Sequence, residues 1–282
     1  MSQNSENTIV IEANSSLFNI NLKELWQYRD LIFLFVKRNY TTRYKQTILG
    51  PAWLVITPLL STILYSVIFT GVAHLPTDGV PALAFYMSGN ILWACFASCL
   101  NQTSGTFLNN AYIMGKVYFP RLVMPISTVL TAMCDFCIQF VLFLCVLGVL
   151  RINGNVFQCN IGLLLIPFII LQFAMLGLGC GIIISSLTTK YRDLNVLLGF
   201  GVQLWMYASP VVYSYSLIPE KYQMVYKLNP VTPCLLVFRY AFFSIGEMPY
   251  IEWGISWIVT ILLLVFGIAI FNKVEKTFMD TV

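Results

Sequence analysis

The sequence predicts an all-α polytopic membrane protein, and two observations predict this class. Of the 282 residues, 58% are hydrophobic and only 10% are charged, whereas soluble chains average about half and about a quarter. The chain also holds six apolar runs, and roughly 20 such residues are enough to cross a hydrocarbon core about 30 Å thick. The six predicted transmembrane helices lie near 51–73, 82–108, 122–150, 161–187, 195–215 and 251–271.

The segment before the first run divides into a tail and a helix. Residues 1–20 lack a basic start and a small-residue cleavage site after a short apolar core, so they predict a cytosolic tail and not a secretory signal. Residues 22–42 predict an amphipathic helix in the inner membrane interface, because most of their apolar side chains fall on one helical stripe. That stripe consists of Leu22, Leu25, Trp26, Ile32, Phe33 and Val36. Residues 21–282 then form a single transmembrane domain.

The distribution of Lys and Arg sets the orientation of the spans. With the N-terminus inside, twelve of the sixteen basic residues lie on the cytosolic side. This asymmetry fits the positive-inside rule, so both termini are expected in the cytosol. Residues 216–250 then lie outside, and three prolines break them into segments too short to span. They predict short re-entrant helices before the last span.

The sequence lacks the motifs of an enzyme active site. Its only histidine is His74, its twelve carboxylates are scattered, and no HExxH or GxSxG motif occurs. The pair Gly115-Lys116 is not part of a P-loop, so ATP-driven work would need a partner chain. We find no signature of nucleic-acid binding, of a metal site or of a cofactor held by this chain. The eight cysteines lie mostly in apolar runs, where thiols behave as small hydrophobic groups.

Two features inside the predicted spans are informative. Asp135 lies about thirteen residues into the third span, roughly 20 Å deep at 1.5 Å per residue, and Gln139 follows one turn later. An acid at such a depth is a functional hypothesis. A structural or channel-lining role is favoured over proton coupling, because we find no further titratable groups in the spans to form a relay. In the fourth span, GLGCG at 177–181 predicts close helix packing.

Three segments, taken together, resemble a known family: RYKQTILGPAW at 43–53, NAYIMGKVYFPR at 110–121 and LNPVTPCLLVFRYAFF at 228–243. They are similar to the membrane subunits of ABC-2 type exporters for cell-surface polysaccharides, the O-antigen and teichoic acid permeases. The resemblance covers nearly the whole chain after residue 20. It implies a homodimer in the bacterial cytoplasmic (inner) membrane, paired with two copies of a separate P-loop ATPase that binds ATP and Mg. The implied cargo is a polysaccharide on a polyprenyl pyrophosphate carrier.

The resemblance also implies four sets of functional residues. Coupling to the ATPase is assigned to Tyr112, Lys116, Tyr118, Phe119, Pro120 and Arg121. Reception of the lipid pyrophosphate at the inner interface is assigned to Arg43, Tyr44 and Lys45, since arginine binds phosphate with a bidentate fork. For a glycan cargo, a channel needs aromatic faces for sugar C–H groups and polar groups that replace water. On this ground the glycan channel is assigned to Tyr86, Asn90, Trp93, Phe96, Gln102, Asp135 and Tyr207. The outer gate is assigned to Asn229, Pro230 and Arg239.

Other functions stay open at this point. Teichoic acid export and small-molecule efflux by an ABC-2 permease belong to the same class. A polytopic lipid-linked sugar transferase belongs to another class, but it needs a cytosolic carboxylate cluster, and Asp193 is the only acid in its loop. A proton-driven transporter using Asp135 would work without an ATPase. The basic residues Lys37 and Arg38 fit attraction to anionic lipid equally well.

Overall fold

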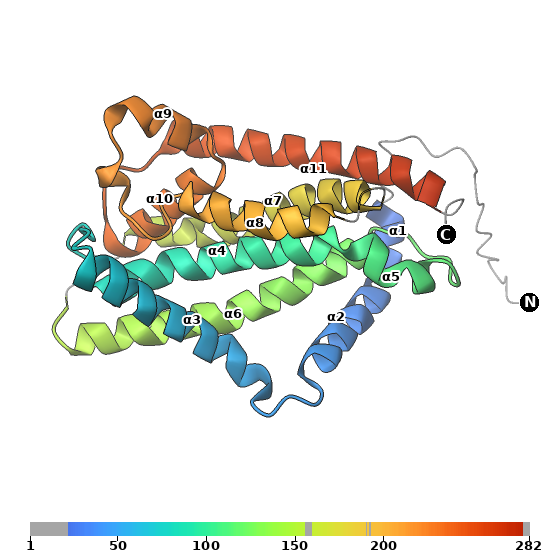
Figure 1. The fold of residues 1–282 in the computed structure, drawn as a ribbon, viewed down its shortest axis with the longest axis horizontal. Coiled ribbons are helices and arrows are strands. Elements are labelled where there is room, and N and C mark those ends of the chain that lie inside the picture. Colours follow the sequence, from blue (N-terminus) through green and yellow to red (C-terminus); the bar gives the residue numbers. More distant parts are fainter. Residues whose placement is uncertain (1–21, 156–159, 190, 192, 279–282) are drawn as a thin grey trace, which may run out of the picture.

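The computed structural model describes residues 22–155, 160–189, 191 and 193–278, and every regular element among them is helical (Figure 1). This confirms the all-α class. The long helices run along one common axis, so the molecule has two ends. One end gathers α1, α5 and the last turns of α11, and the other gathers α9 and α10 (Figure 1). The α-helices are α1 (Leu22–Gln27), α2 (Arg29–Tyr44), α3 (Trp53–Tyr65), α4 (Ala82–Ser104), α5 (Thr106–Met114), α6 (Val123–Ile152), α7 (Ile166–Thr188), α8 (Leu194–Tyr207), α9 (Glu220–Leu228), α10 (Val231–Phe243) and α11 (Tyr250–Phe278).

Five helical stretches in the described residues are long and apolar enough to cross a membrane. They are Gly50–Val72, Ala82–Ser104, Val123–Ile152, Ile161–Thr188 and Tyr250–Val274. The first joins the 3₁₀ turn Gly50–Ala52, α3 and the π-helical turns Ser66–Val72, and the fourth begins with the 3₁₀ turn Ile161–Leu165.

The segment predicted as the fifth of six spans, 195–215, is shorter than expected. Its helix, α8, has 14 residues and is about 21 Å long, so the six-span count is not confirmed by length. The helix ends at Tyr207, and the chain then turns at Ser209 and Pro210. Proline has no backbone N–H and disfavours helical geometry in the residue before it, so the apolar run continues while the helix does not.

Two other predicted helices are interrupted. The second span ends at Ser104 instead of 108, and after Gly105 the chain continues as α5. The predicted amphipathic helix breaks at Tyr28 into α1 and α2. Its buried face also differs from the predicted stripe, because α2 packs along α6 and directs Ile32 and Phe35 inward, while Phe33 is exposed.

Helix α4 is the centre of the fold, since most of its residues are buried against α3, α6 and α7. The close approach of α7 depends on the glycines of the GLGCG segment. A Cβ at Gly177 would lie 2.5 Å from Cys99 Cβ on α4, and a Cβ at Gly181 would approach α4 equally closely. A Cβ at Gly179 would lie 2.9 Å from the Leu264 backbone nitrogen on α11. The segment therefore packs against two helices at once, which confirms the prediction of close helix packing.

Candidate functional site

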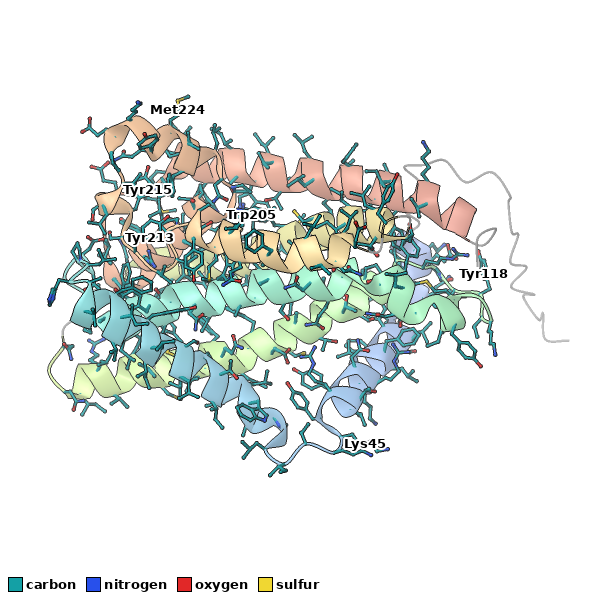
Figure 2. The ribbon with its side chains drawn as sticks, in the orientation of Figure 1. Lys45, Tyr118, Trp205, Tyr213, Tyr215 and Met224 are labelled. Carbon is teal, nitrogen blue, oxygen red and sulfur yellow. The ribbon has the colours of Figure 1, made fainter. Side chains whose placement is uncertain are left out.

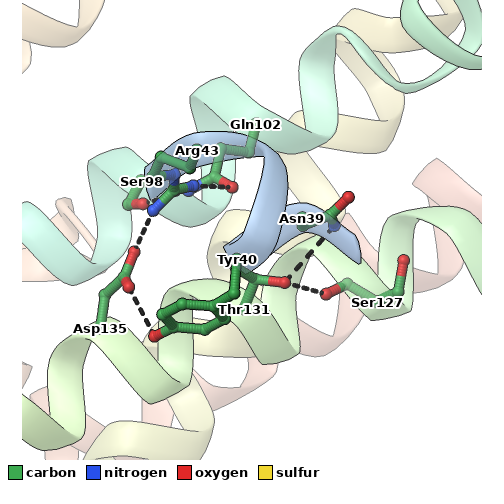
Figure 3. Close-up of polar contacts among 8 residues, drawn as sticks. All are labelled: Asn39, Tyr40, Arg43, Ser98, Gln102, Ser127, Thr131 and Asp135. Atoms are coloured by element: carbon green, nitrogen blue, oxygen red, sulfur yellow. Dashed lines mark hydrogen bonds and ion pairs between the residues drawn. The ribbon is translucent and has the colours of Figure 1, made fainter. Parts of the chain in front are cut away.

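A polar network joins the C-terminal half of α2 to α6 and α4 (Figure 3). The Arg43 guanidinium donates from Nη1 to Asp135 Oδ2 at 2.5 Å and from Nη2 to Gln102 Oε1 at 2.8 Å. The Tyr40 hydroxyl donates to the second carboxylate oxygen, Asp135 Oδ1, at 2.7 Å. Burial and this hydrogen bond raise the pKa of Tyr40, so its hydroxyl remains protonated. Both oxygens of the buried carboxylate thus accept hydrogen bonds from α2.

The same face of α2 makes further contacts towards its N-terminal end. Asn39 Nδ2 donates to Thr131 Oγ1 on α6 at 3.4 Å, and Arg38 Nη2 donates to Asn110 Oδ1 on α5 at 3.1 Å. The Phe35 ring packs against Phe119 with 5.9 Å between centroids. Helix α2 therefore connects the Arg43–Asp135 pair with the segment between α5 and α6.

The network divides α6 into two parts of unequal length. From Asp135 to Ile152, α6 rises about 26 Å, which is close to the roughly 30 Å of the hydrocarbon core. From Val123 to Asp135 it rises about 18 Å, and this part packs against α2 and α5. The loop after α2, which carries Lys45, lies partway along the bundle (Figure 2). The depth of roughly 20 Å expected for Asp135 stays a prediction, and the whole of Val123–Ile152 is apolar enough to cross a membrane.

A cleft of about 460 Å³ opens beside this network. Its volume is within the range of about 300–1,000 Å³ that is typical of ligand pockets. One wall carries the polar groups of α2 and α6, and the opposite wall carries apolar side chains of α3. The lining residues that matter below are Arg43, Tyr44, Trp53, Leu54, Asp135 and Phe136. The structure thus brings Arg43 and Tyr44, predicted to receive phosphate, together with Asp135, predicted to line the channel.

The predicted coupling residues divide into exposed and packed side chains. Tyr112 on α5 and Tyr118 in the loop after it are 73% and 65% exposed. Figure 2 shows Tyr118 at the end of the molecule where α5 lies. Lys116 Nζ lies 2.5 Å from the Tyr112 hydroxyl and 3.8 Å from its ring centroid. Phe119 was predicted to contact a partner, but it is buried against Phe35. Its ring connects the loop to α2, while Pro120 and Arg121 are half-buried beside it.

Four of the predicted channel residues lie in the packed interior of this subunit: Tyr86, Asn90, Trp93 and Phe96. The Tyr86 hydroxyl bonds to Thr70, and Asn90 Nδ2 donates to Ser61 Oγ at 2.8 Å. The rings of Trp93 and Phe96 pack against Trp205 on α8. These side chains are held by neighbouring helices and are buried among the described residues of the subunit. Gln102 is half-buried in the network, and Tyr207 is 48% exposed.

The predicted gate residue Arg239 fixes the turn that follows α8. Its side chain is buried and donates from Nη1 to the Pro210 carbonyl and from Nη2 to the Val211 carbonyl, both at 2.8 Å. The guanidinium carbon lies 3.9 Å from the centroid of the Phe85 ring. A Cβ at Gly89 would lie 2.4 Å from the Val211 carbonyl oxygen, so only glycine lets the turn approach α4.

The other two predicted gate residues also hold this region together. Asn229 Oδ1 accepts from Trp205 Nε1 at 3.0 Å, and Asn229 Nδ2 donates to Ser209 Oγ at 2.8 Å. The Pro230 carbonyl accepts from Ser256 Oγ on α11 at 2.6 Å. The predicted outer gate is therefore a hydrogen-bonded junction between α8, α10 and α11.

Sequence reasoning missed Tyr40, which holds Asp135 together with Arg43. A usable signal was present, because Tyr40 and Arg43 are three residues apart and share one face of a helix. The expected neighbour of Asp135 was Gln139, which lines the same cleft. A partner on α2 could not be inferred without the packing of α2 on α6.

Comparison with known proteins gives one family and several relatives. Residues 30–243 match the ABC-2 type transporter family. The chain is similar to an O-antigen export system permease protein, RfbA, of Klebsiella pneumoniae, with 30% identity over 254 residues that cover 89% of this chain and 94% of the relative. A second Klebsiella pneumoniae protein of that name matches to the same extent. An RfbA protein of Myxococcus xanthus is 27% identical over 226 residues, covering 79% of this chain and 84% of the relative.

Proposed function

We propose that this chain, which belongs to the ABC-2 type transporter family, is the membrane permease subunit of an ABC exporter for a cell-surface polysaccharide. The cargo would be an O-antigen-like glycan on a polyprenyl pyrophosphate, carried from the cytosol across the bacterial cytoplasmic membrane. The observation that carries this proposal is the similarity to O-antigen export permeases over 89% of the chain. The five long apolar helices support a membrane subunit.

We further propose that a separate ATPase supplies the energy and that two permease subunits work together, with both termini in the cytosol. The sequence carries no P-loop, so the ATP and Mg would be bound by the partner. The exposed aromatic and basic side chains of Tyr112, Lys116 and Tyr118 form a surface of the kind that anchors a protein partner. The largely exposed apolar face of α3 leaves room for a second subunit or lipid.

The cleft beside Arg43 supports reception of the lipid carrier. Its lining includes the Arg43 guanidinium on one side and apolar side chains such as Trp53 and Leu54 on the other. Arg43 and Tyr44 line it, and Lys45 is exposed nearby. An isoprenoid chain and a diphosphate need these two kinds of surface together.

The test of this function is to deplete the chain in its host and to analyse polyprenyl-linked glycans extracted from the membrane. We expect long lipid-linked polymer to accumulate while surface polysaccharide declines, and the sugar composition of the polymer separates an O-antigen from a teichoic acid. Disabling the P-loop of the partner ATPase is expected to give the same accumulation, which excludes a proton-driven transporter. Unchanged surface polysaccharide without accumulation would refute glycan export and favour small-molecule efflux.

Reversing the charge of Lys116 is expected to weaken coupling to the ATPase. Because Lys116 is exposed beside Tyr112, Lys116→Glu leaves the packing of the helices intact and places a like charge against an acidic partner surface, which costs several kcal/mol. We expect at least a tenfold loss of partner binding, measured by co-purification from membranes. The control is Lys273→Glu, an exposed lysine near the cytosolic end of α11. Equal losses in both variants would show that net charge, and not the position of Lys116, determines binding.

A further inference from the structure

We propose that Asp135 is a resident counter-anion that occupies Arg43 until the phosphate of a lipid head group takes its place in the cleft. This inference rests on the proposed function, because it describes how the subunit would hold the head group of its cargo. It assigns to Asp135 a role that is neither channel lining nor proton coupling.

The Arg43 side chain has the capacity to serve two anions. A guanidinium carries five N–H donors in a fixed fork, and the contacts to Asp135 and Gln102 use one from each terminal nitrogen. The side chain is 34% exposed and lines the cleft, so part of the fork is open to a ligand. Phosphate oxygens accept from such a fork in bidentate fashion, which a single carboxylate oxygen does not.

Asp135 is in the opposite situation. Its side chain is 9% exposed, and a carboxylate removed from water needs a nearby positive charge. Arg43 supplies that charge, while Tyr40 supplies a neutral hydrogen bond. A phosphate that binds Arg43 therefore competes with Asp135 for one cation. The ion pair balances the charges of Arg43 and Asp135 when the cleft holds no lipid. It also lowers the affinity of the cleft for anions that bind weakly.

The exchange also affects the position of α2. Arg43 and Tyr40 attach the end of α2 to Asp135, and Phe35 attaches its middle to Phe119 beside the coupling surface. When a phosphate binds Arg43, the contact between α2 and α6 loses the ion pair between Arg43 and Asp135. The state of the head-group site is thereby communicated along one helix to the loop between α5 and α6.

The cleft matches the chemistry of a lipid phosphate. Its network lies about 26 Å along α6 from Ile152, which is close to the roughly 30 Å thickness of a hydrocarbon core. Trp53 and Leu54 on α3 and Phe136 on α6 line it, and they offer an apolar surface for a hydrocarbon chain. Two lipids share this chemistry, a polyprenyl diphosphate and an ordinary anionic phospholipid, and the experiment below distinguishes them.

The test uses the full-length subunit in nanodiscs of neutral phosphatidylcholine, titrated with farnesyl pyrophosphate and, for comparison, with farnesol. We expect farnesyl pyrophosphate to bind and farnesol to bind much more weakly. Asp135→Asn keeps the shape of the side chain and removes its charge, so we expect roughly tenfold tighter binding of the diphosphate. Arg43→Gln is expected to weaken binding at least tenfold, and the double variant is expected to behave like Arg43→Gln.

Matched controls separate this competition from general charge effects. Asp193→Asn removes an exposed acid in the loop before α8, and Arg151→Gln removes an exposed arginine at the far end of α6. Both are expected to bind the diphosphate within about twofold of the unchanged chain. Thermal unfolding checks that each variant is folded. If Asp135→Asn does not fold, Asp135→Ser serves as a second variant without the charge.

The outcomes are distinct. If removing the Asp135 charge leaves the affinity unchanged or lowers it while Arg43→Gln still weakens binding, Asp135 is no competitor and the inference is overturned. If farnesyl pyrophosphate binds no better than farnesol, the cleft is no phosphate site, which also overturns it. Phosphatidylglycerol added to the nanodiscs competes fully if phospholipid is the occupant, and this supports the exchange with that lipid as its source. The proposed export of a glycan is tested separately, by measuring lipid-linked polymer in depleted cells. A failure of the proposed function is thereby distinguished from a failure of this inference.

Discussion

Replacing Arg239 by methionine is expected to lower the free energy of unfolding of the subunit by roughly 3 kcal/mol or more. Methionine fills much of the same volume, but it leaves the carbonyls of Pro210 and Val211 without donors in a buried place. Each hydrogen bond to a charged donor contributes about 1.5 to 3 kcal/mol, and a buried carbonyl that loses its donor costs its full desolvation penalty. The turn after α8 is expected to detach from α4, which it contacts closely at Gly89.

This effect is measured by thermal unfolding of the purified subunit in micelles and by limited proteolysis of the turn at 208–214. We expect a lower unfolding temperature and new cleavage in that turn. The matched control is Arg151→Met, because Arg151 is an exposed arginine at the end of α6. If both variants unfold at the temperature of the unchanged protein, the two carbonyl contacts of Arg239 do not stabilise the fold.

Gly179→Ala is expected to lower the free energy of unfolding by about 1 to 3 kcal/mol, because it inserts a methyl group between two helix backbones. The new Cβ would lie 2.9 Å from the Leu264 nitrogen and 3.0 Å from the Leu264 Cα. Neither atom belongs to a flexible side chain. Gly267 on α11 faces Gly179 in the same way, with its own Cβ position 2.9 Å from the Gly179 carbonyl oxygen. The two helices must therefore separate along their whole contact.

Gly201→Ala on α8 is the control for this prediction. A Cβ at Gly201 meets nothing within 4 Å, so alanine there is expected to stabilise the helix by up to about 1 kcal/mol. The two variants carry the same chemical change and differ only in their surroundings. Unfolding midpoints in micelles are expected to shift in opposite directions. A downward shift of equal size in both would mean that glycine at 179 is not required for the packing of α7 on α11.

Much of the fold could be predicted from the sequence, because hydrocarbon thickness fixes the length of a membrane helix. The runs that became α6 and the stretch Ile161–Thr188 were found within a few residues. The run at 195–215 was not, since its apolar composition continues through Pro210 although the helix cannot. Composition alone does not reveal where an apolar backbone leaves helical geometry.

The candidate site was less predictable, because its contacts join segments far apart in the chain. Arg43 and Asp135 were both singled out, but in different roles, since nothing local shows that α2 packs beside α6. The aromatic residues Trp93 and Phe96 were expected in a glycan channel, and their burial depends on the position of α8. Phe119 was expected to face a partner, yet it packs on Phe35. A sequence shows which side chains have useful chemistry, but packing decides what they touch.

The length of α6 has one more consequence. Roughly 18 Å of this helix precede Asp135, and this part packs against α2 and α5. Under the proposed coupling, an ATPase seated on the loop between α5 and α6 would stand about 18 Å along α6 from the Arg43–Asp135 pair. Recruitment of that enzyme would then depend on side chains of the permease, such as the exposed Tyr112, Lys116 and Tyr118, and not on the anionic lipid content of the host membrane.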